Sequence, residues 1–185
     1  MGGGNALREA SSREAGGLGL APEERPVVER LTALGIAYER YQHPPIATAE
    51  SAGEHWARID AVHCKNLFLR NQQGSRHYLV ILEHTKRANL RSVAAQIGDG
   101  KLSFASPDRL MRYLGVMPGS VSPFGLIHDH ERHVRVYLDH TLKIAPRISF
   151  HPNINTATIV LCQEDFYRFL ASCRNPIHHV NVAGG

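Results

Sequence analysis

The spacing of apolar residues predicts strands and helices in irregular alternation. Two-residue alternation and short apolar runs predict strands over residues 36–43, 61–71, 77–84, 102–104, 133–139, 144–150 and 151–161. Helical spacing predicts helices over 22–35, 88–98, 106–115 and 163–173, with a short helix over 48–56. This order favours one α+β domain with a curved mixed β-sheet flanked by helices.

The stretch from Ser103 to Leu126 combines a well-marked helix with an unusual loop. Ser106 followed by Pro107 is a typical helix start, and Gly115 ends the helix. Three glycines and two prolines then fall within the eleven residues 115–125. Such a loop suits the presentation of backbone N–H and C=O groups to a polar ligand. An ordinary tight connection between two elements would explain the same residues equally well.

Composition narrows the class of protein. The 185 residues carry a formal net charge of +4 and a pI of about 9.1, which permits a nucleic-acid partner without requiring one. The sequence contains neither an apolar run long enough to cross a membrane nor the apolar core of a signal peptide. Three cysteines without a CxxC motif indicate reduced thiols, and hence a cytoplasmic location.

The first 21 residues differ in composition from the rest of the chain. They include six glycines and few large apolar residues, which predicts a flexible leader over residues 1–21. The folded domain is expected over residues 22–185.

Three residues are candidates for chemistry, each with a structural alternative. Lys65, directly before an apolar run, could hold a phosphate or carboxyl group as a point charge, or could simply extend from a strand end to solvent. His151 could bind substrate or transfer a proton, or could cap the sheet. Cys64 could be a nucleophile with a lowered pKa, although a half-buried strand cysteine is the simpler interpretation.

Cofactor and metal motifs are missing from the sequence. It has no nucleotide-binding glycine loop, no GxSxG and no HExxH. His128, His130 and His133 could suggest metal ligands, but a solvated polar turn is the more common explanation of such a cluster. We therefore expect neither a cofactor nor a metal.

Five segments together resemble a known family. They are HPPIATAES (43–51), CKNLFLRN (64–71), LSFASPDRL (102–110), LGVMPGSVSPFGLIHD (114–129) and FHPNINTATIVL (150–161). In order and sequence they resemble the free-standing relatives of the prolyl-tRNA synthetase editing domain, the YbaK/ProX superfamily. The chain is most similar to the ProX-type branch, which removes alanine from mischarged tRNA for proline. Residues 83–90 depart from the string that relatives usually carry.

The resemblance implies an enzyme that hydrolyses the ester between an amino acid and the terminal adenosine of tRNA. Lys65, Gly115 and His151 would be catalytic, with Lys65 near the acceptor end and His151 by the aminoacyl group. Water would attack the ester carbonyl with help from the tRNA ribose hydroxyl, while loop backbone groups stabilise the oxyanion. The substrate-binding residues would be Asn66, Met117, Pro118, Gly119, Ser120 and Val121.

The resemblance also implies a pocket and partners. Because they share the loop, Met117, Val121 and Phe124 are the candidates for the apolar wall of a pocket sized for alanine. The expected partners are aminoacyl-tRNA for proline and, in association, prolyl-tRNA synthetase. Three basic residues could touch tRNA phosphates, although a solvated helix face is a more common role for them: Lys86, Arg87 and Arg91.

Other hypotheses remain open at this point. Within the superfamily, cysteine or another small amino acid could be the substrate. The same pocket could bind aminoacyl-tRNA or a synthetase without catalysis. A thiol-dependent hydrolase using Cys64 with a histidine is the third alternative.

Overall fold

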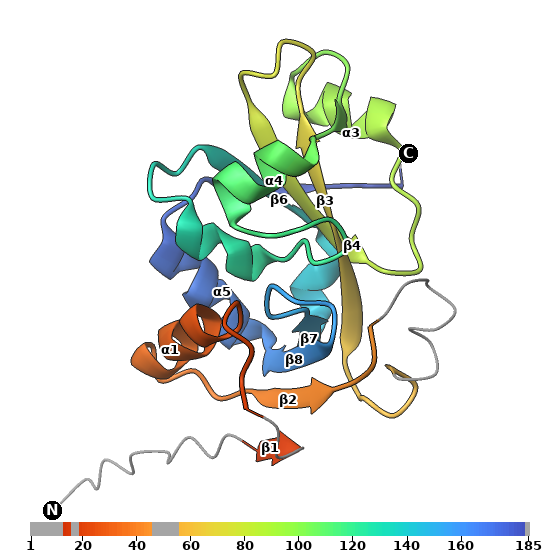
Figure 1. The fold of residues 1–185 in the computed structure, drawn as a ribbon. Helices are drawn as coiled ribbons and strands as arrows, with labels where there is room; N and C mark the ends of the chain where they lie inside the picture. The colour runs from red at the N-terminus through yellow and green to blue at the C-terminus, as the bar shows by residue number, and fades with distance from the viewer. Residues whose placement is uncertain (1–12, 16–18, 46–55, 184–185) are drawn as a thin grey trace, which may run out of the picture.

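The computed structural model describes residues 13–15, 19–45 and 56–183, which form a mixed sheet of nine strands flanked by helices (Figure 1). Eight strands follow the order β1-β2-β8-β7-β3-β4-β6-β9, and β5 pairs with β3 outside this path. The strands are β1 (Arg13–Ala15), β2 (Glu39–Gln42), β3 (Val62–Arg70), β4 (His77–Glu83), β5 (Ser103–Phe104), β6 (Val134–Asp139), β7 (Arg147–Phe150), β8 (Ala157–Cys162) and β9 (Ile177–Val180). The helices are α1 (Arg25–Ala33), α3 (Leu90–Ile97), α4 (Pro107–Leu114) and α5 (Gln163–Cys173), with 3-10 helices η1 (Pro123–His128) and η2 (His140–Ile144). The predicted α+β class with a mixed sheet is confirmed.

Strand β3 joins two parts of the sheet. Its first residues, Val62 and His63, pair in parallel with β7, and its remainder pairs antiparallel with β4. On the β7 side, β8 pairs antiparallel with both β7 and β2, whereas β4, β6 and β9 run parallel to one another. In Figure 1, β3 and β4 rise from the region of β2, β7 and β8 towards α3. The hydrogen-bonding pattern therefore changes at β3.

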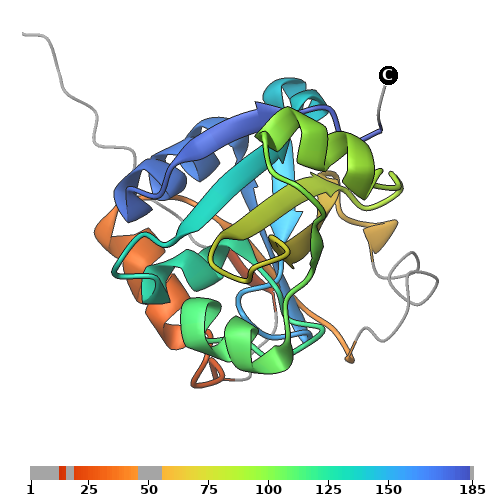
Figure 2. The same cartoon turned by 90° about the horizontal axis from the view of Figure 1, so that it is seen from above.

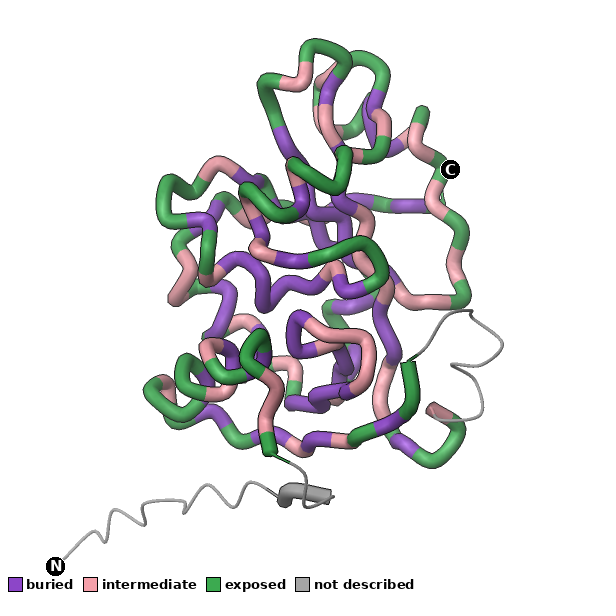
Figure 3. Tube along the Cα trace, in the orientation of Figure 1, coloured by how far each residue is buried: buried purple, intermediate pink, exposed green. Residues whose placement is uncertain are grey.

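Apolar clusters cover both faces of the sheet, and β4 contributes to each. Leu79 and Ile81 of β4 pack in the larger cluster, together with side chains of α1, α4, η1 and α5. Tyr78, Val80 and Leu82 pack in the smaller one, under α3. Figure 2 shows α3 on the opposite side of the strands from α1 and α4. Alternate side chains of β4 point to opposite faces, and both faces are covered, so the strand is buried along most of its length (Figure 3). This explains why its sequence is a nearly continuous run of apolar residues.

Side-chain and glycine caps set the bounds of α4 as the sequence predicts. The Ser106 hydroxyl accepts a hydrogen bond from the Arg109 N–H at 3.4 Å, and Pro107 occupies the first turn. Gly115 ends the helix in the left-handed conformation with φ of 63°. These local signals place the following loop at a defined point of the fold.

Helix α3 begins later than expected. Asn89 is its N-cap and accepts from the Ser92 N–H at 3.1 Å, so the helix starts at Leu90 rather than Ala88. Lys86 lies in the loop before the helix, where it forms an ion pair with Asp139. The proposed solvated helix face is therefore wrong for Lys86.

Several connections differ from the sequence-based expectation. The strand expected from residue 36 begins at Glu39, because the Ile36 N–H still bonds to the Leu31 carbonyl at the end of α1. The strand expected over 144–150 begins at Arg147, since η2 occupies 140–144. Helix η1 was not predicted.

Two other expectations fall largely outside the described residues. The helix expected over 48–56 is described only at its last residue, and most of the 1–21 leader is likewise not described. Within that leader, β1 pairs in parallel with β2. None of the described helices is long and apolar enough to cross a membrane.

Candidate active site

The loop after α4 opens with a tight turn held by proline and glycine. The Ser120 N–H donates to the Met117 carbonyl at 3.1 Å, which places Pro118 and Gly119 at the centre of the turn. Gly119 has φ of 87°, and proline followed by a glycine with positive φ is typical of a type II turn. Gly115 is needed for a different reason, because a Cβ there would lie 2.7 Å from Cδ2 of His128.

This loop and the loop after β7 line a cavity of about 250 Å³, here called the loop cavity. The first loop contributes Gly115, Val116, Met117 and Ser120, and the second contributes residues 153–156. Three of the predicted site residues, Gly115, Met117 and Ser120, therefore share one cavity. Pro118, Gly119 and Val121 belong to the same loop but do not line it.

The loop cavity is lined by a buried amide that lacks partners. Asn153 is 4% exposed, and among the described residues neither its Nδ2 nor its Oδ1 has a hydrogen-bond partner. Its φ of 64° lies in the left-handed region, which asparagine tolerates better than most residues. An unpaired buried amide costs on the order of 1–3 kcal/mol, so such a group beside a cavity indicates a place for a polar ligand.

Asn66 connects β3 to the loop rather than lining the cavity. Its Nδ2 donates to the Val121 carbonyl at 2.9 Å, and its buried Oδ1 has no hydrogen-bond partner among the described residues. The single bond fixes the end of the loop against the sheet. The predicted substrate contact of Asn66 therefore remains a prediction, while a positioning contact is present.

Lys65 lies on the opposite face of β3 from Asn66. Lys65 pairs across the strands with Leu82 of the smaller cluster, whereas Asn66 pairs with Ile81 of the larger one. Partial burial, and secondly the nearby guanidinium of Arg87, lower the pKa of Lys65. In the described part of the chain neither cation has an acidic partner within 4.0 Å, which leaves both available to an anion.

His151 belongs to a group of aromatic side chains, the His–Trp cluster, formed by His43, Trp56, His63, His84 and His151. Trp56 stacks on His63 with ring centroids 4.6 Å apart, and lies 6.5 Å from His151. The Nδ1 of His151 bonds to the Ala157 carbonyl at 2.9 Å, and burial is the main cause that lowers the pKa of His151. His63 precedes Lys65 by two residues in β3, so Lys65 adjoins this cluster on the same face.

The predicted site residues form two groups, one at the loop cavity and one at or beside the His–Trp cluster. Two segments of the chain, one in β3 and one after β7, contribute residues to both groups. Lys65 and Asn66 are consecutive but face opposite sides of β3. His151 begins the same loop whose residues from Asn153 onwards line the loop cavity. The segment 46–51 of the matching motifs lies outside the described residues.

Burial makes Cys64 a poor nucleophile. Its side chain packs in the larger cluster, and desolvation, followed by the charges of Glu83 and Asp139, raises the pKa of the thiol far above its usual value. The reactive thiolate is thus disfavoured at neutral pH. This argues against the thiol-dependent hydrolase.

The structure gives Phe124 and the clustered histidines roles that differ from those expected. Phe124, expected in the pocket wall, is fully buried and packs edge-on against Phe169 at 5.0 Å. The three clustered histidines diverge: His128 packs against Gly115, while His133 bonds through Nε2 to His77 at 2.8 Å. The residues that the structure describes include no group of three or more metal-ligating side chains.

Sequence-based reasoning did not single out Asn153 or Trp56. Asn153 occurs in the quoted motif FHPNINTATIVL, but nothing in its residue type predicts that its amide is buried and unpaired. Trp56 is the only tryptophan of the chain. Its large ring with one polar N–H could have marked it as a candidate for packing against aromatic or polar side chains.

Comparison with known proteins finds relatives over most of the chain. Residues 43–169 match the model of the aminoacyl-tRNA editing domain. The chain is 37% identical over 160 residues to the prolyl-tRNA editing protein ProX of Acetoanaerobium sticklandii, covering 86% of this chain and 97% of that protein. It is 34% identical over 146 residues to prolyl-tRNA synthetase associated domain-containing protein 1 of Bos taurus, covering 77% of this chain and 85% of that protein.

The fold also occurs among solved structures. One of these, proposed to be a trans-editing enzyme for prolyl-tRNA synthetase, superposes with a TM-score of 0.68 and 21% sequence identity. The match covers 90% of this chain and 100% of that one, so the two chains share this fold over most of their length.

Proposed function

The chain belongs to the aminoacyl-tRNA editing domain family and is an aminoacyl-tRNA deacylase, and from this premise we propose that it edits mischarged tRNA for proline in trans, with Ala-tRNA(Pro) as its substrate. The observation that carries the choice of tRNA is the similarity to the prolyl-tRNA editing protein over nearly the whole of that protein. A cytoplasmic location and an association with prolyl-tRNA synthetase accompany this proposal, the latter supported by the name of the bovine relative.

The chemistry of the proposed reaction needs no protein nucleophile. Water adds to the ester carbonyl, the bond to the ribose oxygen breaks, and the products are a free amino acid and a tRNA with a free hydroxyl. The tRNA ribose hydroxyl assists the water. Val116 and Met117 line the loop cavity, and no described residue accepts from their backbone N–H groups, which are thus available to the developing oxyanion.

Side chains on both sides of β3 would hold the substrate. Lys65, with Arg87 beside it, offers positive charge to a phosphate near the acceptor end. The Asn153 amide offers the N–H donors of Nδ2 and the acceptor Oδ1 to a polar group that enters the loop cavity. The protonated Cys64 thiol supports attack by water over attack by sulfur.

Editing for alanine has a physical reason. A synthetase pocket built for proline rejects the smaller alanine weakly, because missing methylene contacts are worth only about 1–3 kcal/mol. A second site that excludes proline by size restores fidelity, because it then hydrolyses only the smaller product. Cysteine, which is also small, is the alternative substrate of the same site.

Deacylation of tRNA for proline charged separately with alanine, cysteine and proline tests the proposal. We expect rapid loss of alanine, and we expect Lys65→Ala to lower kcat/KM at least tenfold while the protein stays folded. Lys143→Ala is the matched control, since Lys143 is exposed on η2. Loss of cysteine alone would change the substrate, and binding of Ala-tRNA without hydrolysis would indicate a non-catalytic module. Full activity of folded Lys65→Ala would refute its role.

A further inference from the structure

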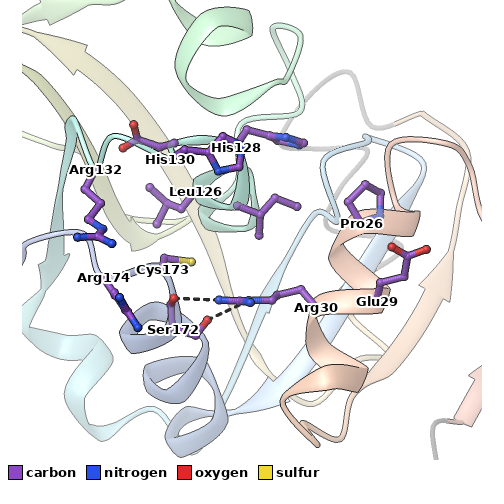
Figure 4. Close-up of a pocket in the computed structure, with 12 residues that line it drawn as sticks. Pro26, Glu29, Arg30, Leu126, His128, His130, Arg132, Ser172, Cys173 and Arg174 are labelled. Atoms are coloured by element: carbon purple, nitrogen blue, oxygen red, sulfur yellow. Dashed lines mark hydrogen bonds between the residues drawn. The ribbon is translucent and has the colours of Figure 1, made fainter.

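A second cavity, of about 650 Å³, lies between α1, η1 and the end of α5 (Figure 4). We call it the basic cavity, because three arginines and two histidines are among the residues that line it: Arg30, Arg132, Arg174, His128 and His130. In Figure 4, Arg132 and Arg174 lie on one side and Arg30 extends from α1 on the other. None of these residues was assigned a role in the deacylation.

The acidic side chains of the basic cavity do not neutralise its arginines. Asp129 is buried and accepts hydrogen bonds from the backbone N–H groups of His133 and Val134 and from the Asn175 side chain. Glu29 is the other carboxylate in the wall. In the described chain, no ion pair within 4.0 Å joins either acid to Arg132 or Arg174.

Arg132 and Arg174 are held in an unusual backbone conformation. They have φ of 56° and 61°, in the left-handed region that favours glycine. Asp129 and Asn175 join the two turns, because Asn175 Nδ2 donates to Asp129 Oδ2 at 2.7 Å. The framework therefore holds two arginines side by side at positions where glycine would relieve strain.

Arg30 is positioned on the opposite wall by α5. Its Nη2 donates to the Ser172 carbonyl at 2.9 Å and its Nε to the Ser172 hydroxyl at 3.3 Å, as the dashed lines in Figure 4 show. Within the described residues, no carboxylate lies within 4.0 Å of the Arg30 guanidinium to pair with its charge. Cations thus flank the cavity from α1 and from the two joined turns.

The basic cavity adjoins the loop cavity. His128 lines the basic cavity and packs against Gly115, which lines the loop cavity. Helix α1 and the residues before it also border both, through Pro26 on one side and Glu23 on the other. An RNA whose end enters the loop cavity would therefore pass close to the basic cavity.

We infer that the basic cavity binds backbone phosphate of the tRNA body, with Arg132 and Arg174 as the contacting residues. This inference rests on the proposed function, and it identifies a docking surface separate from the residues that contact the reacting ester. Guanidinium groups bind phosphate oxygens through paired N–H donors, which suits two arginines on one rim.

Titration of uncharged tRNA for proline against the full chain at several salt concentrations tests the surface. We expect the double variant Arg132→Gln/Arg174→Gln to bind more weakly, with a salt slope smaller by about two, since each lost phosphate contact lowers the slope by about one. Lys101→Gln/Lys143→Gln removes the same charge from exposed positions that line neither the basic cavity nor the loop cavity, and is the matched control. An unchanged slope in the first variant, or an equal loss in both, would overturn the inference.

Two further measurements separate docking from catalysis and from folding. With alanyl-CCA trinucleotide, which lacks the tRNA body, the Arg132→Gln/Arg174→Gln variant should match the wild type, while its KM for Ala-tRNA rises. An equal loss on both substrates would contradict a docking role.

Arg174→Gly should raise the melting temperature by about 2–4 °C and still weaken tRNA binding, because it relieves the strained backbone and removes the charge. If the wild type deacylates no charged tRNA, the proposed function fails, whereas the salt titration still decides the surface.

Discussion

At the scale of single residues, His77 is the side chain whose surroundings most clearly select one protonation state. It is fully buried, its Nε2 accepts from Arg109 at 2.7 Å, and its Nδ1–H donates to His133 at 2.8 Å. Burial, followed by the neighbouring His133 and Arg109, lowers the pKa of His77 to about 4. The folded protein therefore holds this ring neutral, while the unfolded chain protonates it below about pH 6.5.

The lowered pKa makes stability depend on pH in a predictable direction. Above about pH 6.5 the contribution of His77 is complete, and it is lost as the pH falls towards 4, because only the unfolded state takes up the proton. The loss amounts to at most roughly 3 kcal/mol. Urea unfolding at pH 7, 6 and 5 measures it, and His77→Asn should show a shallower decline. Parallel curves for the two proteins would show that His77 is not the titrating group.

Replacing Asn153 should change activity strongly and stability little. We expect Asn153→Gly to keep the free energy of unfolding within about 1 kcal/mol of the wild type, because it removes an unpaired amide and relaxes a positive φ. Its kcat/KM for Ala-tRNA should fall at least tenfold.

The control for Asn153 is a buried asparagine that is fully bonded. Asn71 accepts from the N–H groups of Ser75 and Arg76 in the β3–β4 turn. Asn71→Ala should lower stability by about 1–3 kcal/mol without changing kcat/KM. If both variants lose stability alike and Asn153→Gly stays active, Asn153 is only structural.

At the scale of elements, a buried ion pair joins α1 to β2. Arg40 donates through Nε and Nη2 to the two carboxylate oxygens of Glu24, both at 2.9 Å, and the side chains are 5% and 1% exposed. Glu24 also accepts from the Ala21 N–H at 3.0 Å. This contact holds the beginning of α1, which borders both cavities, against the edge of the sheet.

Removing one partner of this pair should be strongly destabilising. Glu24→Gln removes the negative charge that accepts two hydrogen bonds from the buried Arg40 guanidinium, and we expect a loss of about 3–5 kcal/mol in the free energy of unfolding. The double variant Glu24→Leu/Arg40→Met should lose less than Glu24→Gln alone, because no charge is left buried. Chemical denaturation of the single and double variants measures the coupling, and additive losses would rule it out.

At the scale of the whole molecule, one sheet supports two groups of functional residues. The loop cavity and the basic cavity lie on the side of the larger apolar cluster, bordered by α1 and by the loops on either side of η1. Lys65 and the His–Trp cluster lie on the other face of β3. Because β4 is buried on both faces and β3 contributes side chains to both apolar clusters, the two strands form a rigid support from which both groups are positioned.

The fold could be predicted wherever local chemistry decides the structure. The helix of residues 107–114 follows from Ser106, Pro107 and Gly115, which act on their own backbone neighbours. The helix over 163–173 follows from the spacing of Phe166, Phe169 and Leu170, all buried. The motifs around Lys65 and the proline–glycine loop likewise led to the family without the structure.

Relationships between distant residues were decided only by the tertiary structure. A strand places Lys65 and Asn66 on opposite faces, but only the tertiary structure decides which apolar cluster each face meets. The unpaired amide of Asn153 likewise depends on what surrounds it. The pairing of Glu24 with Arg40 and the joining of Asp129 to Asn175 connect residues that are far apart in the chain. The sequence by itself determined most of the helices and strands, the family and the proline–glycine loop, because those depend on backbone preferences and residue types. Packing alone decided which apolar cluster each face of β3 meets, which distant side chains form hydrogen bonds and ion pairs, and where the two cavities lie. The physical reason is that burial and hydrogen bonding between distant segments exist only after the chain has folded.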